Sequence, residues 1–346
     1  MDIIRIGMDT SKSVFQLHGV DAREQPVLRR KLRRRQVVEF FGKLSGVKIG
    51  IEACGGAHYW ARELVALGHE VVVLPPQYVK PYVKRGKTDA SDAEAICEAM
   101  SRPSMRFVAV KTSESQAAQM LMKVRAQLIG RRTQLSNAIR GHAAEFGLVA
   151  ARGLGRLADL MQRIRGEEGL PDLAGEMFEL QYAEYERLQD DIVAVEARLM
   201  AVQRGSEVSR RLAEIPGIGP IGAMLLTIKA SDTQGFGSGR DFAAWIGLTP
   251  KNHGTAGKNR MGVITRAGDT MLRSVLVAGA TSFIQQVRRG RSRSWPWLED
   301  LLKRKSPKLA AVALANKLAR IAWKLMVSGE RYRPAAAAGA AGMQAA

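Results

Sequence analysis

Four short runs of aliphatic and β-branched residues constrain the fold of the N-terminal part of this chain most strongly. They cover residues 3–8, 14–20, 47–52 and 71–74, and each has the length and composition of a β-strand. Helical patterns occupy residues 57–67 and 89–101. Two successive strands followed by alternating strands and helices predict a mixed α/β domain.

Four acidic side chains stand at the ends of these predicted elements. Asp9 follows the first run, Glu52 ends the third, and Asp89 and Asp92 open the second helical pattern. Acids three residues apart share one face of a helix, so the four carboxylates could form one pocket. Hard cations such as Mg²⁺ or Mn²⁺ prefer such oxygen ligands. Each acid alone also fits a capping or turn role, so the prediction of a metal site rests on all four together.

Positive charge is concentrated in two parts of the chain. The chain has 53 Lys and Arg against 33 Asp and Glu, a formal charge of +20, of which residues 1–110 carry +6, 111–208 carry −1 and 209–346 carry +15. This surplus favours nucleic acid over an anionic membrane as the partner, and a solvated basic surface with no partner is the alternative. Candidate phosphate-binding residues in the two densest runs are Arg30, Lys31, Arg33, Arg34, Arg288, Arg289, Arg291 and Arg293.

Several protein classes do not fit the sequence. The first residues lack the basic lead and apolar core of a secretory signal, and no apolar run reaches the roughly 18 residues of a membrane span. Two cysteines and five scattered histidines make neither a disulfide framework nor a zinc site. We therefore expect a cytoplasmic protein with no membrane partner.

The middle segment, 111–208, is predicted to be helical. Apolar residues at spacings of three and four form a heptad seam, and a looser seam precedes it, beyond the Gly-rich stretch 147–175. The two helices could pack on each other as an antiparallel pair or pair with another protomer, and the pattern does not decide between these. The stronger seam contains Tyr185, Leu188, Ile192, Val195, Leu199 and Val202.

The last segment begins with a Pro-Gly-Ile-Gly turn between two predicted helices. Such a turn is typical of a helix-hairpin-helix element, in which the backbone around Gly217 and Gly219 binds a DNA phosphate; tight turns between helices also use these residues. A polar Gly-rich loop is expected over 253–262, helices over 270–287 and 308–327, and a disordered tail over 334–346.

Five motifs in this order resemble one family, the DEDD transposases of bacterial insertion sequences, which are relatives of the Piv DNA invertases. Several members of that family are bridge-RNA-guided recombinases. The resemblance covers about residues 3–333, and its specificity lies in the order and separation of the motifs. They are Ile6–Lys12, Ile51–Gly55, Lys87–Ala93, Ile215–Gly219 and Phe242–Pro250.

This resemblance implies a RuvC-like ribonuclease H domain whose acidic quartet, here Asp9, Glu52, Asp89 and Asp92, binds Mg²⁺. It also implies a coiled-coil middle and a C-terminal domain whose loop hydroxyl attacks DNA covalently. The matching position is Thr255, where the family usually has serine, and threonine offers the same hydroxyl with more steric hindrance. Lys258 and Arg260 would stabilise charge on the attacked phosphate or contact the DNA backbone nonspecifically, and Lys87 is a further candidate nucleic-acid contact.

The function implied is that of a transposase that cuts and rejoins donor and target DNA under the direction of a guide RNA. We expect a RuvC-like domain over 1–110, a coiled-coil region over 111–208, a transposase domain over 209–333, and a homo-oligomer, either dimer or tetramer, in the bacterial nucleoid. One alternative is a Holliday-junction resolvase or site-specific invertase. Another is a non-enzymatic helix-hairpin-helix binder, although four carboxylates would weaken its hold on phosphates.

Overall fold

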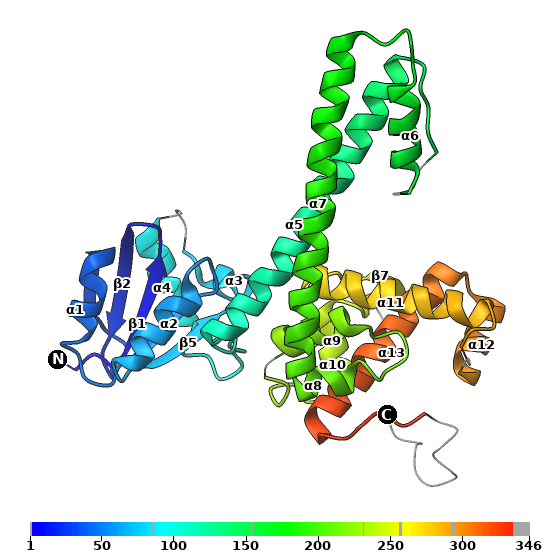
Figure 1. The fold of residues 1–346 in the computed structure, drawn as a ribbon. Coiled ribbons are helices and arrows are strands. Elements are labelled where there is room, and N and C mark those ends of the chain that lie inside the picture. Colours follow the sequence, from blue (N-terminus) through cyan, green and yellow to red (C-terminus); the bar gives the residue numbers. More distant parts are fainter. Residues whose placement is uncertain are drawn as a thin grey trace. The chain divides into compact units, whose positions relative to one another are not determined.

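The computed structural model describes residues 2–84, 86, 88–151, 153, 155–230, 232–255, 258–292 and 295–334. The chain forms two compact units, which divide between Gln116 and Ala117 (Figure 1). No helix among the described residues is both long and apolar enough to span a membrane.

The first unit is built on a five-stranded sheet. Its strands are β1 (Arg5–Thr10), β2 (Val14–Val20), β3 (Pro26–Arg33), β4 (Lys48–Glu52) and β5 (Glu70–Leu74). The spatial order is β3-β2-β1-β4-β5; β1 to β3 form an antiparallel meander, whereas β1, β4 and β5 run parallel. The mixed α/β prediction is confirmed, and this sheet with its helices is consistent with a ribonuclease H-like domain.

Helices cover both faces of this sheet. Helices α1 (Val37–Phe41) and α2 (Ala57–Ala66) pack on the face that carries the largest cluster of buried side chains in this unit. Helix α4 (Asp89–Ala99) crosses the other face over β1 and β2, as Figure 1 shows. The short helix α3 (Pro76–Val79) and two 3₁₀ turns, η1 (Arg34–Gln36) and η2 (Lys80–Tyr82), complete the unit.

Two glycines allow α4 to lie close to the sheet. A Cβ atom on Gly7 would stand 2.2 Å from the carbonyl oxygen of Ala93, and one on Gly50 would stand 2.7 Å from the sulfur of Met100. Both distances are shorter than van der Waals contact: a side chain at Gly7 would require the backbone of α4 to shift, whereas one at Gly50 would require the Met100 side chain to move. Gly7, in the first motif, and Gly50, just before the second, therefore have a packing role, and Gly7 limits the height of α4 above the strands.

The cationic run 29–35 differs from the sequence prediction. It falls between two of the predicted strands, 14–20 and 47–52, yet residues 29–33 belong to β3, an edge strand of the sheet. Only Leu32 of this stretch is buried, so its hydrophobic signal is too weak to indicate a strand. Charged residues are a common device on edge strands because they discourage pairing with other chains.

Two long helices run antiparallel, and all but the first turn of the earlier one belongs to the second unit (Figure 1). They are α5 (Ser113–Glu145) and α7 (Asp172–Gly205), and α6 (Arg156–Arg165) packs between their connected ends. The guanidinium of Arg125 lies 2.5 Å from the carboxylate of Glu196, and that of Arg131 lies 3.0 Å from Glu184. We predicted that the two helices pair either with each other or with another protomer, and in this structure they pair with each other. Coiled-coil packing between them stays a prediction.

The remaining helices share one hydrophobic core with the N-terminal part of α5 and the C-terminal part of α7. They are α8 (Glu207–Leu212), α9 (Pro220–Lys229), α10 (Gly239–Ile246), α11 (Thr270–Arg288), α12 (Pro296–Arg304) and α13 (Pro307–Ser328). The turn between α8 and α9 contains Gly217 at a φ of +90°, and a Cβ on Gly279 of α11 would lie 2.1 Å from the Gly217 carbonyl oxygen. The predicted tail 334–346 lies outside the described residues apart from its first position.

The region predicted as a Gly-rich loop is a β-hairpin. Strands β6 (Pro250–Thr255) and β7 (Lys258–Ile264) pair antiparallel, with Thr255 opposite Lys258. The segment is rich in polar residues and glycines and lacks the alternating apolar residues by which a strand is predicted, because both faces of the hairpin are largely exposed. The expectation of a loop over 253–262 was therefore wrong.

Candidate active site

The four acids of the predicted quartet converge on one face of the first unit. Asp9 and Glu52 each follow the paired residues Met8 and Ile51 on the adjacent parallel strands β1 and β4. Side chains alternate between the faces of a strand, so both acids share the face of Gly7 and Gly50, which α4 covers. Asp89 and Asp92 occupy the first turn of α4 and so lie above the same strand ends.

A capping box fixes the start of α4. The backbone N–H of Ser91 donates to the Thr88 hydroxyl over 3.2 Å, and the backbone N–H of Thr88 donates to the Ser91 hydroxyl over 3.0 Å. These bonds satisfy backbone donors that a helix start otherwise leaves unpaired. They therefore hold the turn that presents Asp89 and Asp92.

The electrostatics of Asp9 show how closely the acids approach. Burial first, and then the charges of Asp92, Asp89 and Glu52, raise the pKa of Asp9 to about 6, against a smaller opposing effect of the Thr10 backbone N–H. Like charges that raise a carboxyl pKa must lie near one another in a poorly solvated place. A cation bound among them would relieve this repulsion, so the donor chemistry fits a divalent metal.

The side chains are not yet arranged around an ion. Within the part of the chain that the structure describes, no three Asp, Glu, His or Cys side chains meet closely enough to form a ready-made metal site. The carboxylates therefore converge without coordinating geometry, and rotation of their side chains would be needed to bind a shared cation.

Two residues at the rim of this site were not among the predicted site residues. The Thr10 hydroxyl lies 2.9 Å from the sulfur of Cys54, which is exposed. Each residue follows an acid of the quartet closely, Asp9 in one case and Glu52 in the other. The contact ties the ends of β1 and β4 together. Both residues fall inside the motifs that carry the resemblance, which is the signal that could have singled them out.

The predicted nucleophile belongs to the second unit. Thr255 is the last residue of β6, and Arg260 on β7 pairs with His253. Arg260 is exposed, whereas the side chains of Thr255 and Lys258 lie outside the described part of the structure. The acids and Thr255 are therefore carried by different compact units.

The remaining predicted nucleic-acid contacts occupy several places. Gly219 caps the exposed start of α9, and Gly217 forms the turn before it. Arg288 ends α11, and Arg289 and Arg291 follow at its exposed end. Lys87 and Arg293 lie outside the described residues.

The four cations predicted in the first run do not form one surface. Arg30 stands over the ring of Phe40 at 5.0 Å, and Arg34 stands over the ring of Trp60 at 5.0 Å. Both rings belong to the helices on the face opposite the acids. Lys31 and Arg33, which alternate with Arg30 along β3, point to the acid face instead.

Two protein-family models match the chain. The model of the DEDD transposases matches residues 6–146, which include all four acids, and the model described as the IS116/IS110/IS902 transposase family matches residues 209–294, which include Thr255. The matched segments thus contain both predicted centres.

Individual proteins are similar to the chain over nearly its whole length. A transposase of Sinorhizobium fredii is 64% identical over 96% of this chain and 86% of its own length. A family 20 transposase of Pseudomonas aeruginosa is 46% identical over 96% of this chain and 100% of its own length. The transposase of insertion sequence element IS1111A of Coxiella burnetii is 38% identical over 96% of this chain and 92% of its own length. On these matches, the chain belongs to the IS116/IS110/IS902 family of insertion-sequence transposases, enzymes that cut and rejoin DNA.

Proposed function

We propose that this transposase uses the quartet Asp9, Glu52, Asp89 and Asp92 with Mg²⁺ or Mn²⁺ to activate the DNA phosphate that is cut. The observation that supports this is the raised pKa of Asp9, which burial and the three other acids cause together. A divalent ion held there supplies Lewis-acid polarisation of the phosphate oxygens and charge neutralisation. The carboxylates themselves orient the phosphate over the ends of β1 and β4.

Thr255 is the nucleophile in this proposal. Its hydroxyl oxygen attacks the phosphorus and gives up its proton, a new Oγ–P bond forms, and the bond from phosphorus to one sugar oxygen breaks. The departing sugar oxygen takes a proton and becomes a hydroxyl. Because one phosphate ester replaces another, a second sugar hydroxyl can reverse the exchange and rejoin DNA without an outside energy source.

Arg260 and Lys258 would stabilise charge on the attacked phosphate, since they flank Thr255 on the β6–β7 hairpin. The turn at Gly217 and Gly219 would bind a DNA phosphate through backbone N–H groups in the helix-hairpin-helix manner. Arg288, Arg289, Arg291, Arg293 and Lys87 would contact DNA or RNA backbones.

A guide RNA would choose the target and donor sites, because phosphate contacts carry no sequence information. Each predicted segment would have its own role. Residues 1–110 would supply the catalytic carboxylates, 111–208 a coiled-coil spacer, and 209–333 the nucleophile. The acids and Thr255 belong to different compact units, which supports assembly as a dimer or tetramer. In such an assembly one protomer would supply the acids and another would supply Thr255. The protein would act in the cytoplasm, on DNA of the nucleoid.

Covalent trapping tests this proposal. The full-length protein is incubated with end-labelled DNA carrying the insertion-sequence end and with Mg²⁺, and labelled protein is resolved on a denaturing gel. A labelled band that disappears in Thr255→Val and in Asp9→Ala supports both roles. Cleavage without any adduct would instead indicate hydrolysis by water, as in a junction resolvase. Sequencing the RNA that co-purifies with the protein tests the guide.

A further inference from the structure

The pairing register of the sheet places one row of cations beside the carboxylate site. Asp9 on β1 lies directly opposite Gln16 on β2, and Gln16 lies directly opposite Lys31 on the edge strand β3. Residues directly opposite each other in antiparallel strands share a face, so all three side chains lie on the face that carries the acids. With neighbouring strands about 4.8 Å apart, the Cα atoms of Asp9 and Lys31 are separated by about 10 Å.

Two more cations extend this row along the edge of the sheet. Arg29 lies opposite His18 and Arg33 lies opposite Val14, and both share the face of Lys31. Alternate residues on a strand are about 7 Å apart, which is roughly the separation in space of neighbouring phosphates along one nucleic-acid strand. Arg29, Lys31 and Arg33 thus repeat at a spacing that suits consecutive phosphates of a nucleic-acid strand.

The register also places Arg29 beside charged groups of α4 and its surroundings. Arg29 lies opposite His18, whose pKa is lowered by burial first and by the charges of Arg29, Lys84 and Arg5, against the opposing charge of Glu94 on α4. Glu94 already forms an ion pair with Lys84. Arg29, Lys31 and Arg33 are all exposed, so their charges are directed to solvent rather than to the core.

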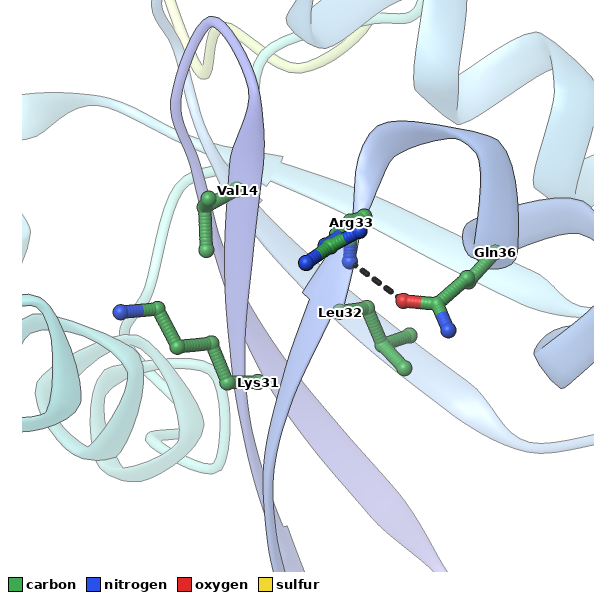
Figure 2. A pocket seen from close by; sticks show the side chains of 5 residues that line it. All are labelled: Val14, Lys31, Leu32, Arg33 and Gln36. Carbon is green, nitrogen blue, oxygen red and sulfur yellow. Dashed lines mark hydrogen bonds between the residues drawn. The ribbon is translucent and has the colours of Figure 1, made fainter.

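The surface is hollowed where this row ends. A pocket of about 390 Å³ is lined by Val14, Lys31, Leu32, Arg33 and Gln36, and Figure 2 shows these side chains from close by. The backbone N–H of Arg33 donates to the Gln36 side-chain oxygen over 2.8 Å, which fixes the turn that closes the pocket. Two cations and an amide around an open hollow suit an anionic group such as a phosphate.

We propose that Arg29, Lys31 and Arg33 form a phosphate-binding strip that holds the backbone of the DNA delivered to the carboxylates. Gln16 separates the strip from Asp9, so the cations hold phosphates that flank the reacting one and leave the carboxylates free for metal. Arg30 and Arg34 are excluded from the strip because they stack on Phe40 and Trp60 on the opposite face. The inference rests on the proposed function of the carboxylates and adds the path of their substrate.

Alternation along β3 supplies a matched pair of variants. The acid-face variant is Lys31→Gln with Arg33→Gln, and the opposite-face variant is Arg30→Gln with Arg34→Gln. Each variant removes two positive charges from the run 29–35. Affinity of the full-length protein for a short fluorescein-labelled DNA duplex of arbitrary sequence is measured over a range of salt concentrations, because backbone contacts need no particular sequence.

The expected result is specific to one face. The log of the affinity falls as the log of the salt concentration rises, and each phosphate contact on a duplex makes this fall steeper by about 0.9. The acid-face variant should therefore have a slope that is less steep by about 1.8. The opposite-face variant should keep the wild-type slope and instead lose thermal stability, since its guanidinium groups pack on aromatic rings. Equal slopes for the two variants, whether lowered together or both unchanged, would overturn the strip.

A second arm uses RNA of the same sequence. A loss of slope with RNA alone would overturn the assignment to DNA. The outcome is also independent of the proposed chemistry: Asp9→Ala tests the carboxylates through covalent adduct formation, and the salt slope tests the strip through binding without metal. Either can fail while the other succeeds.

Discussion

Gly7 of β1 lies directly opposite Gly50 of β4, and each stands two residues before an acid of the quartet. Because Gly7 has no side chain, α4 lies close to the sheet, and the charges of Asp89 and Asp92 in its first turn raise the pKa of Asp9. The geometry of the carboxylate site therefore depends on glycine at position 7.

The first prediction concerns this approach. Gly7→Ala places a methyl group 2.2 Å from the Ala93 carbonyl oxygen, a backbone atom that cannot rotate away. We expect the local unfolding of β1 and α4 to become easier by about 3 kcal/mol, and the covalent protein–DNA adduct to be lost. Hydrogen exchange of peptides from both elements measures the opening.

Gly175→Ala is the control for that substitution. A Cβ at this position of α7 meets no atom within 4 Å, so the change should stabilise the helix by about 0.5–1 kcal/mol. If β1 and α4 of Gly7→Ala exchanged hydrogen at the wild-type rates, α4 would be able to shift without loss of stability.

The second prediction concerns pH. The pKa of Asp9 is raised from 3.8 to about 6, so the folded protein binds this proton more tightly than the unfolded chain does. Stability without metal should fall as the pH rises through that interval. Asp9→Asn removes the charge and should make β1 more stable at neutral pH by about 1–2 kcal/mol, a figure reduced for the partial exposure of Asp9.

Hydrogen exchange of β1 with a chelator present, at several pH values, measures this effect. The advantage of Asp9→Asn should disappear as the pH falls below 3.8, where the Asp9 carboxyl of the wild type is protonated in the folded and the unfolded chain alike. Added Mg²⁺ should stabilise the wild type more than the variant. An advantage of the same size at every pH would contradict the electrostatic explanation.

The third prediction concerns the cap of α4. Thr88→Ala removes the hydroxyl that accepts the Ser91 N–H and should destabilise the start of the helix by about 1 kcal/mol. Because this turn presents Asp89 and Asp92, the affinity for Mg²⁺, measured by calorimetry, should fall as well.

The matched control is Thr112→Ala, since Thr112 accepts the Ser115 N–H over 3.1 Å at the start of α5 in the same way. It should cost similar stability and leave the affinity for Mg²⁺ unchanged. Equal metal affinity for the two variants would show that the cap of α4 does not position the acids.

The fourth prediction concerns the nucleophile. Thr255→Ser keeps the hydroxyl and removes the hindering methyl, so adduct should form at least as fast as in the wild type. Thr255→Val keeps the shape and removes the hydroxyl, so adduct and recombination should fall by several orders of magnitude while DNA affinity is retained. Full recombination by Thr255→Val would exclude the role of Thr255.

Local sequence patterns predicted much of the fold. The runs that became β1, β2, β4 and β5 and the helix α4 were recognisable because their aliphatic periodicity matches their buried faces. Strand β3 and the β6–β7 hairpin were missed for the opposite reason. They are polar and exposed, and pairing with another strand, rather than burial of their own side chains, defines them.

The order of residues along the chain was enough to predict the groups of the site: four acids at the ends of predicted elements, a hydroxyl in a polar segment and a large positive charge. It could not show which of these groups share a surface, because that depends on how the strands pair. The cations of residues 29–35 look continuous in the sequence, yet the pleat of β3 sends Lys31 toward the acids and Arg30 onto Phe40. Register explains this: β3 is held by hydrogen bonds to β2, and that pairing, rather than the side chains of β3 themselves, sets the face on which each side chain lies.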